Sequence, residues 1–393
     1  MQMINHLPLA GDVSPAVRAL GWDWAIEDTC QNYVAREAVQ LAENEAETLL
    51  QAADTLYEML VEAIPDPMPD EFLQRLAIPA NLWAVVRHSW NDERHWHLYG
   101  RFDLALTPDG PKLLEFNADT ATSLPETAVV QWASLVAAGQ SDEGRQANGL
   151  FECLEDQLRH WRALNNDRQA TLLLVYLPGS AEDEANCAVL AEAARAARFA
   201  DVHLCPIDDM KVSVQAEDRG VWAETGPAQW QKFDFLFKLV PWEILADEEP
   251  ELTADLAQLQ LTHDVVIANP AYCLLFQSKG LLAHLWDVFP HHPLLLESGL
   301  TALSGHHVRK PFYGREGQNV AEIQPNGQAS TEVPGDFAHQ PQLYQRWADL
   351  PTDAQGRRYQ AGIFWAGEAC AIGFRREDGL ITNLSEFVPH VLV

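Results

Sequence analysis

The sequence is short of basic residues and of cysteines, and each shortage argues against a class of protein. It has 26 lysines and arginines against 57 acidic residues, a net charge of −31 over 393 residues. Such a surface repels nucleic acid and anionic membranes, so we expect neither as a partner. Acidity would favour a cationic substrate such as a polyamine, although a role in solubility alone explains it equally simply. The six cysteines are scattered without a Cys-x-x-Cys pair, as is typical of reduced thiols in a cytoplasmic protein.

Targeting and membrane signals are also missing. The N-terminus has no basic region followed by an apolar stretch, so we expect no signal peptide. No apolar run approaches the roughly 20 residues that cross a bilayer. The expected localisation is cytoplasmic, and the sequence leaves the oligomeric state unknown. An apolar content of 47% predicts a globular chain with room for two or three domains.

Zinc-like motifs are absent as well. Neighbouring histidines occur in three places, but they lack the spacing to cysteines or to a third ligand that zinc sites show. We therefore expect structural or surface roles for these pairs, which are His95 and His97, His291 and His292, and His306 and His307.

The pattern of apolar residues changes along the chain. A long amphipathic helix is predicted from about residue 25 to 63, with further helices near 126–138 and 151–163. Residues 168–270 alternate strand and helix patterns and predict a small parallel sheet, with strands at 171–176, 202–205 and 233–237 and a helix at 181–197. A helix near 280–289 and several strands follow.

The most informative stretch is a predicted β-hairpin around the turn Thr107–Gly110. If this turn is centred on Asp109, the facing pairs are Asp103 with Glu115, Arg101 with Asn117, and Phe102 with Phe116. A one-residue bulge would break this register. Two opposed carboxylates repel each other and favour a cation, and oxygen ligands suit Mg²⁺ better than Zn²⁺. The alternative is an ordinary solvated hairpin face.

Two lysines could bind phosphate. Lys310 ends a strand before the glycine-bearing turn Gly314–Gly317, whose backbone N–H groups could hold phosphate oxygens. Lys279 precedes a helix that Ser278 could cap, which would place a positive helix end nearby. Each feature alone is more often structural, and no Walker A motif is present.

Together these features resemble the ATP-grasp superfamily, in the order found in the glutathionylspermidine synthase family, where the metal ribbon precedes the lysines. The resemblance covers the synthetase part over nearly the whole chain and is closest to stand-alone bacterial members described as acid–amine ligases. It is carried by Gly100–Asp103, Glu115–Ala121, Ser278–Gly280, Phe289–His292, Lys310–Pro311 and Gly314–Gly317.

The resemblance implies an α/β (α+β) architecture: a permuted ATP-grasp fold with a small parallel-sheet pre-ATP-grasp-like domain. Residues 1–167 would supply N-terminal helices and the metal-binding hairpin of the ATP-grasp domain. Residues 168–270 would form the substrate domain, and residues 271–393 the lid and nucleotide-binding strands.

The implied activity is an ATP-dependent carbon–nitrogen ligase that joins a small-molecule acid, peptide-like, to an amine through an acyl phosphate, with Mg²⁺. Arg101 would contact the transferred phosphoryl group, and Arg375 would be a mobile active-site arginine, with Arg376 as the alternative. The implied Mg²⁺ ligands are Asp103, Glu115 and Asn117. The implied ATP-binding residues are Lys279, Lys310, Glu316, Gly317, Gln345, Arg346 and Gln360. The implied substrate-binding residues are Thr120, Thr122, Asp183, Glu184 and Lys238.

One departure concerns the substrate. Where the family has Trp-Lys-Thr-Trp, this chain has Phe237–Val240, so apolar Leu239 replaces a hydroxyl. We therefore expect glutathione and spermidine not to be the preferred pair. Two other functions stay open: a catalytically idle nucleotide-binding interaction module, and a kinase-like phosphotransferase on the same fold.

Overall fold

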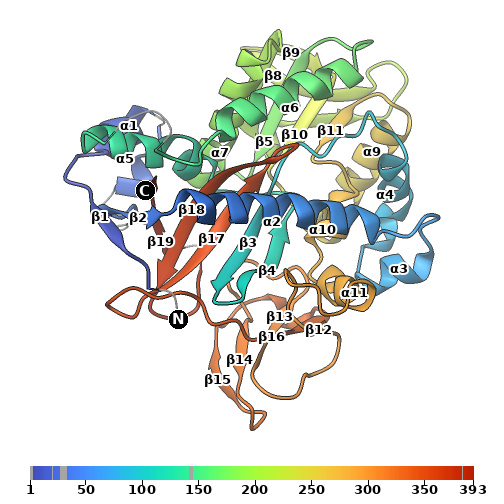
Figure 1. Ribbon diagram of the computed structural model, residues 1–393. Coiled ribbons are helices and arrows are strands. Elements are labelled where there is room, and N and C mark those ends of the chain that lie inside the picture. Colours follow the sequence, from blue (N-terminus) through green and yellow to red (C-terminus); the bar gives the residue numbers. More distant parts are fainter. Residues whose placement is uncertain (1–2, 20, 27–32, 141–144, 383) are drawn as a thin grey trace.

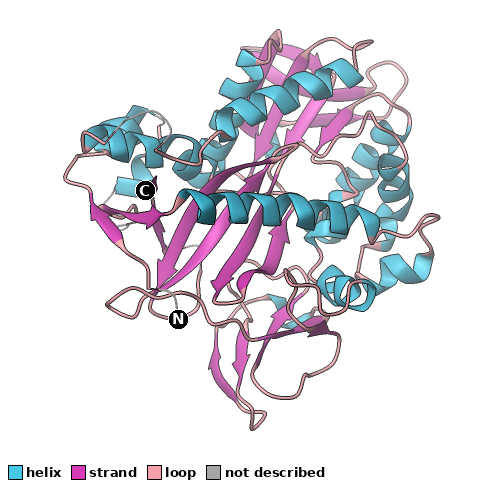
Figure 2. Ribbon diagram, in the orientation of Figure 1, coloured by secondary structure: helices cyan, strands magenta, loops and turns pink. Residues whose placement is uncertain are grey.

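The computed structural model describes residues 3–19, 21–26, 33–140, 145–382 and 384–393. Figure 1 shows three sheet-containing regions: a central sheet crossed by a long helix, a smaller sheet flanked by helices, and a further sheet at the opposite side. Figure 2 shows that helices and strands are mixed throughout. In the described ranges, no helix is both long enough and apolar enough to span a membrane. The mixed α/β architecture expected from the sequence is confirmed.

The central sheet is antiparallel and has five strands in the order β19-β18-β17-β3-β4. These are β3 (Gly100–Thr107), β4 (Gly110–Asn117), β17 (Arg358–Trp365), β18 (Ala369–Glu377) and β19 (Glu386–Val388). The helix α2 (Glu43–Glu62) lies across one face (Figure 1). Its buried residues Leu49, Ala53, Leu56 and Leu60 recur at helical spacing and pack on the sheet.

The β3–β4 hairpin has the predicted register, but for an unexpected reason. The facing pairs are Arg101 with Asn117, Phe102 with Phe116, and Asp103 with Glu115. Thr107 pairs with Gly110, so the turn is centred half a residue before Asp109. A bulge that leaves Leu114 without an opposite residue corrects this shift. The two irregularities cancel, and the predicted pairs form.

The small sheet is parallel throughout, in the order β11-β10-β5-β6. Its strands are β5 (Thr171–Tyr176), β6 (Asp201–Pro206), β10 (Phe235–Lys238) and β11 (Val266–Ala268). Alternate residues of β5 enter two different cores. Leu172 and Leu174 pack with α6 (Leu150–Leu164) and α7 (Ala181–Ala196), whereas Leu173 and Val175 pack in the core that includes α9 (Pro250–Leu261). Both faces are covered, which explains why every residue of β5 is buried.

A third sheet lies against the edge of the hairpin; because it belongs to the segment predicted to form the lid, we name it the lid sheet. Its order is β12-β16-β13-β14-β15, all antiparallel. Its strands are β12 (Ser298–Gly299), β13 (His307–Pro311), β14 (Ala321–Ile323), β15 (Ala329–Glu332) and β16 (Gln342–Arg346). The backbone N–H of Leu113 donates to Leu294 O at 2.8 Å, which joins β4 to the segment before β12.

The predicted helix over 25–63 is wrong in its first half. Residues 27–32 lie outside the described residues, and Glu37–Leu41 form strand β2, not helix. This strand pairs with β1 (His6–Pro8) and, in parallel, with β20 (His390–Leu392). Pairing with a segment at the far end of the chain outweighs the local helical preference.

The remaining elements lie around these sheets. A separate antiparallel sheet, which the sequence did not predict, consists of β7 (Lys211–Ser213), β8 (Gly220–Gly226) and β9 (Gln229–Phe233). The predicted helix near 126–138 begins as a π-turn over Pro125–Val130. The other helices are α1 (Ser14–Ala19), α3 (Asp70–Arg75), α4 (Trp83–Trp90), α5 (Gln131–Ala137), α8 (Trp242–Glu248), α10 (Cys273–Gln277) and α11 (Gly280–Val288).

The cysteines in the described ranges are all free thiols. Cys187, Cys205 and Cys273 are buried, and Cys153 and Cys370 are half-buried. Cys30 lies outside the described residues.

Candidate active site

A cavity of about 540 Å³ opens between the hairpin, the lid sheet and the end of the parallel sheet. Its walls contain every site residue predicted from the sequence except Glu184 and Lys238. The predicted residues that line it are Arg101, Asp103, Glu115, Asn117, Thr120, Thr122, Asp183, Lys279, Lys310, Glu316, Gly317, Gln345, Arg346, Gln360 and Arg375. Because they are spread over most of the chain, only the fold brings them together.

Arg101 and Asp103 form an ion pair on one face of β3. They point the same way because they are two positions apart in a strand. Arg101 donates from Nε to Asp103 Oδ1 at 2.8 Å and from Nη2 to Oδ2 at 3.2 Å. Its Nη1 also donates to Thr122 O at 2.7 Å. The pKa of Asp103 is raised, since burial disfavours its charged form more than Arg101 favours it.

Glu115, opposite Asp103, faces two lysines from the lid side. Lys279 Nζ lies 3.3 Å from Glu115 Oε2. Burial raises the pKa of Glu115, but Lys279 and Lys310 outweigh this and lower it to about 2. Burial lowers the pKa of Lys310 to about 8, although Glu115 acts in the opposite direction. The two carboxylates of the hairpin are thus balanced by three cations from this chain.

The donor set of Asp103, Glu115 and Asn117 fits Mg²⁺. It offers carboxylate and amide oxygens from facing strand positions, without a thiolate or imidazole among the three. Asn117 Nδ2 donates to Asp103 Oδ2 at 3.2 Å, so these two side chains already lie together. Arg101 pairs with Asp103 and Lys279 pairs with Glu115. A bound cation would share these carboxylate oxygens with the two basic side chains.

Besides their interaction with Glu115, both candidate phosphate lysines donate hydrogen bonds to neutral oxygen acceptors. Lys279, just before α11, donates from Nζ to Gly314 O at 2.8 Å, which ties it to the glycine turn. Lys310 on β13 donates to Gln345 Oε1 on the neighbouring strand β16 at 2.9 Å. Ser278 Oγ accepts from Gly280 N at 3.3 Å, but the N-cap of α11 is Lys279, which makes no side-chain cap, so the predicted cap by Ser278 is wrong by one residue.

The Gly314–Gly317 turn borders the cavity. Glu316 and Gly317 have positive φ angles of 55° and 74°, and a Cβ on Gly317 would lie 3.0 Å from Ile381 O. No described residue accepts a hydrogen bond from the backbone N–H of Arg315, Glu316 or Gly317. These N–H groups can therefore bind anionic oxygens, as in other backbone nests.

Of the two adjacent candidate arginines, Arg375 faces the cavity. Arg376 points to the opposite face of β18, where it is buried and forms ion pairs with Glu37 and Glu386. The alternation of side chains along a strand forces this difference, since neighbours cannot share a face. The position therefore supports Arg375 for contact with substrate and gives Arg376 a structural role.

A polar network that the sequence did not reveal surrounds Arg375. Its Nη2 donates to Ser123 Oγ at 2.7 Å and to the Tyr33 hydroxyl at 3.0 Å. The Tyr33 hydroxyl donates to Glu126 Oε1 at 2.5 Å. Burial raises the pKa of Tyr33, and the nearby Glu126 carboxylate adds to this effect. Tyr33 and Glu126 lie far apart in sequence and carry no motif, so only the fold identifies them.

One wall of the cavity is acidic. Glu182 and Asp183 line it from the first turn of α7, where Ser180 Oγ accepts from Asp183 N at 3.2 Å. Burial raises the pKa of Glu182 to about 7 and that of Asp183 to about 6, and the charge of Glu126 contributes at Glu182. The sequence predicted Asp183 and Glu184, but Glu184 is exposed and does not line the cavity. Glu182 takes the place of Glu184, two positions earlier on the helix.

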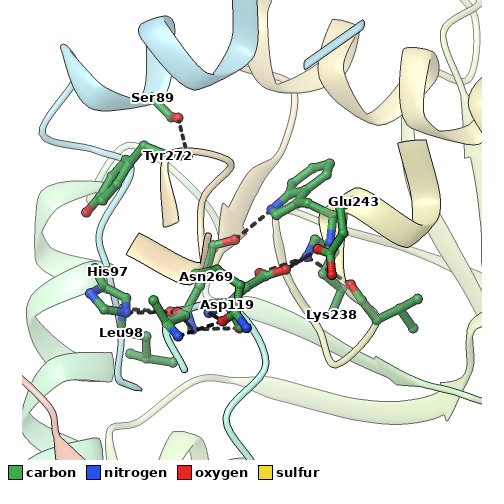
Figure 3. Close-up of polar contacts among 12 residues, drawn as sticks. Ser89, His97, Leu98, Asp119, Lys238, Glu243, Asn269 and Tyr272 are labelled. Carbon is green, nitrogen blue, oxygen red and sulfur yellow. Dashed lines mark hydrogen bonds and ion pairs between the residues drawn. The ribbon is translucent and has the colours of Figure 1, made fainter. Parts of the chain in front are cut away.

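Lys238 is turned away from the cavity and is 1% exposed. Its Nζ lies 3.0 Å from Asp119 Oδ1 and donates to Val240 O at 2.9 Å (Figure 3). Asp119 Oδ2 also accepts from Trp242 N at 2.9 Å. The Asn269 side chain donates to Asp119 O at 2.9 Å, so the whole cluster is tied together. Lys238 thus fixes the segment after the hairpin to the end of β10. Its side chain does not line the cavity, so the proposed site does not include it.

Apolar side chains complete the wall next to this cluster. Leu239, Pro241 and Ile244 line the cavity from the segment after β10, and Leu177 lines it from the segment after β5. Leu239 is buried, with 3% of its surface exposed, and offers no hydrogen bond to a bound molecule.

The chain is similar to several known proteins along most or all of its length. Residues 6–393 match the family model described as glutathionylspermidine synthase preATP-grasp. A Haemophilus influenzae protein provisionally named an acid–amine ligase is 26% identical over 100% of both chains. The bifunctional glutathionylspermidine synthetase/amidase of Escherichia coli is 27% identical over 83% of this chain and 54% of its own length. A solved glutathione synthetase-like effector from Globodera pallida aligns over 97% of both chains with a TM-score of 0.47 and 10% identity. The chain belongs to the glutathionylspermidine synthase preATP-grasp family.

Proposed function

We propose that this protein is an ATP-dependent carbon–nitrogen ligase that joins a carboxylic acid to an amine through an acyl phosphate. One observation carries the proposal: the hairpin carboxylates Asp103 and Glu115 and the lysines Lys279 and Lys310 converge on one cavity. Family membership supports the same reaction class, since the similar proteins in Haemophilus influenzae and Escherichia coli are named as ligase and synthetase.

The phosphate end of the site lies between hairpin and lid. Lys279, Lys310 and the N–H groups of Glu316 and Gly317 would hold the nucleotide phosphates. Gln345, Arg346 and Gln360 would contact the rest of ATP. Mg²⁺ on Asp103, Glu115 and Asn117 would offset the charge of the phosphate oxygens.

Activation of the acid would take place beside Arg101. A carboxylate is a poor electrophile, and transfer of a phosphoryl group to it creates a good leaving group. Arg101 and Arg375, both facing the cavity, would stabilise the charge that develops on the transferred group. Closure of the lid sheet over the cavity would exclude bulk water, which would otherwise hydrolyse the acyl phosphate.

The amine would then attack the acyl carbon, and phosphate would leave. The attacking nitrogen must lose a proton, and the acidic wall of Glu182 and Asp183 offers acceptors with pKa values of about 7 and 6. The same wall would attract a cationic amine, such as a polyamine. Thr120 and Thr122 lie on the acid side of the cavity.

The acid would be peptide-like but not glutathione by preference. Leu239 and Ile244 form an apolar wall where a hydroxyl would be needed to hydrogen-bond glutathione-like groups. Small molecules are the expected partners, and the proposed metal requirement is Mg²⁺.

The direct test is ATP turnover over a matrix of acids and amines, with mass detection of amides. An acid labelled with ¹⁸O in its carboxylate should transfer one labelled oxygen to phosphate if an acyl phosphate forms. A stable phosphorylated acid without amide would instead favour a phosphotransferase. ATP binding without turnover on any pair would favour an interaction module.

A further inference from the structure

Four potential metal ligands outside the cavity converge near the ends of α4 and α9. One ligand atom each from His88, Asp92, His95 and His263 lies within 4.8 Å of the others. His88 is on α4, Asp92 and His95 lie in the segment after it, and His263 follows α9. We name these four residues the α4–α9 cluster. None of them lines the ligase cavity, so the cluster is a separate feature.

Two nitrogen atoms in the cluster are buried without a hydrogen-bond partner. These are Nε2 of His88 and Nε2 of His95. His95 is only 3% exposed, so water does not compensate. The nearest charged oxygen to His88 Nε2 is Asp92 Oδ2 at 3.9 Å, too far for a hydrogen bond. A buried imidazole nitrogen left unpaired is costly, and a bound cation would satisfy it.

The surroundings of His95 can present a lone pair to a cation. His95 Nδ1 lies 3.1 Å from the Gln260 side-chain nitrogen, and Gln260 Oε1 has no partner. A half-turn of this amide places Oε1 against Nδ1, which then carries the proton. Nε2 of His95 is then unprotonated and faces the cluster, the arrangement that outer-shell carbonyls enforce on metal-binding histidines.

The end of α9 fixes the position of His263. His263 has a φ of 58° and follows the C-cap of α9 in a position where glycine is usual. Its N–H donates to Gln260 O at 3.1 Å, and Asp264 N donates to Leu259 O at 2.8 Å, the hydrogen bonds of a Schellman motif. The left-handed backbone of His263 is one that glycine adopts more readily.

Arg94 occupies the edge of the cluster in this structure. Its Nη2 lies 2.7 Å from Asp92 Oδ2 and 2.9 Å from His263 Nε2. The Arg94 side chain is 37% exposed and Asp167 is near enough to interact with it, so it can turn outward. The guanidinium thus supplies, without a metal, the positive charge that the Asp92 carboxylate needs.

We propose that the α4–α9 cluster binds one divalent transition-metal ion, with Zn²⁺ preferred, through three imidazole nitrogens and one carboxylate oxygen. This ligand number and softness suit tetrahedral Zn²⁺ and are unlike the all-oxygen set proposed for Mg²⁺ in the ligase cavity. The ion would be structural. It would join α4, from the N-terminal part of the chain, to α9, which packs beside the small parallel sheet.

The test is titration of the full chain, without a polyhistidine tag and after chelator treatment, with Co²⁺ and Zn²⁺. We expect one equivalent of Co²⁺ to give the strong visible absorption of a tetrahedral site and Zn²⁺ to displace it. Excess Mg²⁺ should not compete. Saturating Zn²⁺ should raise Tm by about 4 °C or more. Absence of a stoichiometric Co²⁺ signal in the wild-type protein would overturn the proposal.

Variants separate the metal site from a merely structural cluster. His88→Ala should weaken Co²⁺ binding by about 100-fold or more, whereas the exposed His339→Ala, outside the cluster, should not change it. His263→Gly relieves the left-handed backbone while removing a ligand. It should therefore raise the Tm of the metal-free protein and abolish the Zn²⁺-dependent rise. Retention of full metal binding in His263→Gly would contradict the assignment.

Discussion

Asp103 lies directly opposite Glu115 across the β3–β4 hairpin, yet each carboxylate is bonded to a different cation of the chain. Asp103 pairs with Arg101 at 2.8 Å, and Glu115 pairs with Lys279 at 3.3 Å. The repulsion expected between opposed carboxylates is therefore already balanced before any metal binds. This balance changes what neutralising either residue should do to stability.

Asp103→Asn and Glu115→Gln should reduce Mg²⁺-dependent turnover by about 10²-fold or more, because each removes a charged oxygen proposed to hold Mg²⁺. Glu115→Gln should also lower Tm by several degrees, since it removes a carboxylate whose charge Lys279 and Lys310 stabilise. Asp103→Asn should not lower Tm, because burial raises the pKa of Asp103 and the folded state disfavours its charged form. Steady-state kinetics over a Mg²⁺ series and calorimetry would check both variants. Wild-type turnover in either variant, or a raised Tm in Glu115→Gln, would contradict this interpretation.

Lys310→Met should abolish ATP binding and yet stabilise the ligand-free protein. Burial lowers the pKa of Lys310 from 10.5 to about 8, so below pH 8 the folded state holds an ammonium that is costly to bury. The wild-type protein regains this stability between about pH 8 and 10.5, as folded molecules lose the proton first. The Tm advantage of Lys310→Met should thus be largest below pH 8 and disappear near pH 10.5. Arg309→Met, with a half-buried side chain on the same strand that pairs with Glu332, is the matched control.

Glu182→Gln should slow amide formation about 10²-fold and remove an ionisation near pH 7 from its pH profile. Burial raises the pKa of Glu182 from 4.5 to about 7, so the wild-type reaction should accelerate as pH rises through 7. The charged form is disfavoured in the folded state, so the wild-type protein loses stability as pH rises from 4.5 to 7. Glu182→Gln should therefore gain Tm relative to wild type above pH 7 and not below pH 4.5. Glu184→Gln, on the exposed side of the helix, should leave the profile unchanged.

Arg375→Lys should mainly affect kcat and Arg376→Lys should mainly affect Tm, although the two residues are neighbours in the sequence. Arg375→Lys loses the planar group that faces the cavity, so kcat should fall by about 10–10²-fold with a small change in Tm. Arg376→Lys breaks the buried contacts with Glu37 and Glu386, so Tm should fall while kcat changes little. The reverse assignment of the two effects would show that Arg376 acts in catalysis.

Leu239→Thr should improve the use of glutathione with spermidine by roughly 10-fold, because a buried hydrogen bond contributes about 1 kcal/mol. The measurement is kcat/KM for glutathionylspermidine formation, compared with the best acid–amine pair found for the wild-type protein. Wild-type turnover of glutathione and spermidine that equals any other pair would refute the predicted specificity.

The sequence predicted well the parts of the fold and site that rest on local patterns. The hairpin, the parallel sheet and the strand carrying Lys310 follow from alternation, turn residues and strand–helix order. The facing pairs of the hairpin were predicted correctly only because the shifted turn and the bulge cancel. The choice between Arg375 and Arg376 as the cavity-facing arginine needed only the register of β18, which places the two side chains on opposite faces. The resemblance to the family named most other cavity residues, although its assignment of Lys238 to substrate is not supported by the direction of that side chain.

Features that depend on distant contacts could not be predicted. The strand at 37–41 exists because residues 390–392 pair with it, and no local window contains both. Tyr33 and Glu126 approach Arg375 only through the fold. Likewise His263 is brought to His88 and Asp92 by the packing of two helices, whereas the sequence showed only the isolated pair of His95 and His97.

The central sheet takes β3 and β4 from residues 100–117 and its other strands from residues 358–388. A ribosome must therefore make nearly the whole chain before this sheet can close. The parallel sheet, in contrast, uses only residues 171–268 and can form earlier in synthesis. Until β17 arrives, one edge of β3 has exposed backbone N–H and C=O groups next to the carboxylates of the hairpin. A nascent chain would thus lack an assembled ATP site until its last strands emerge, and folding order would itself delay ATP consumption by incomplete chains.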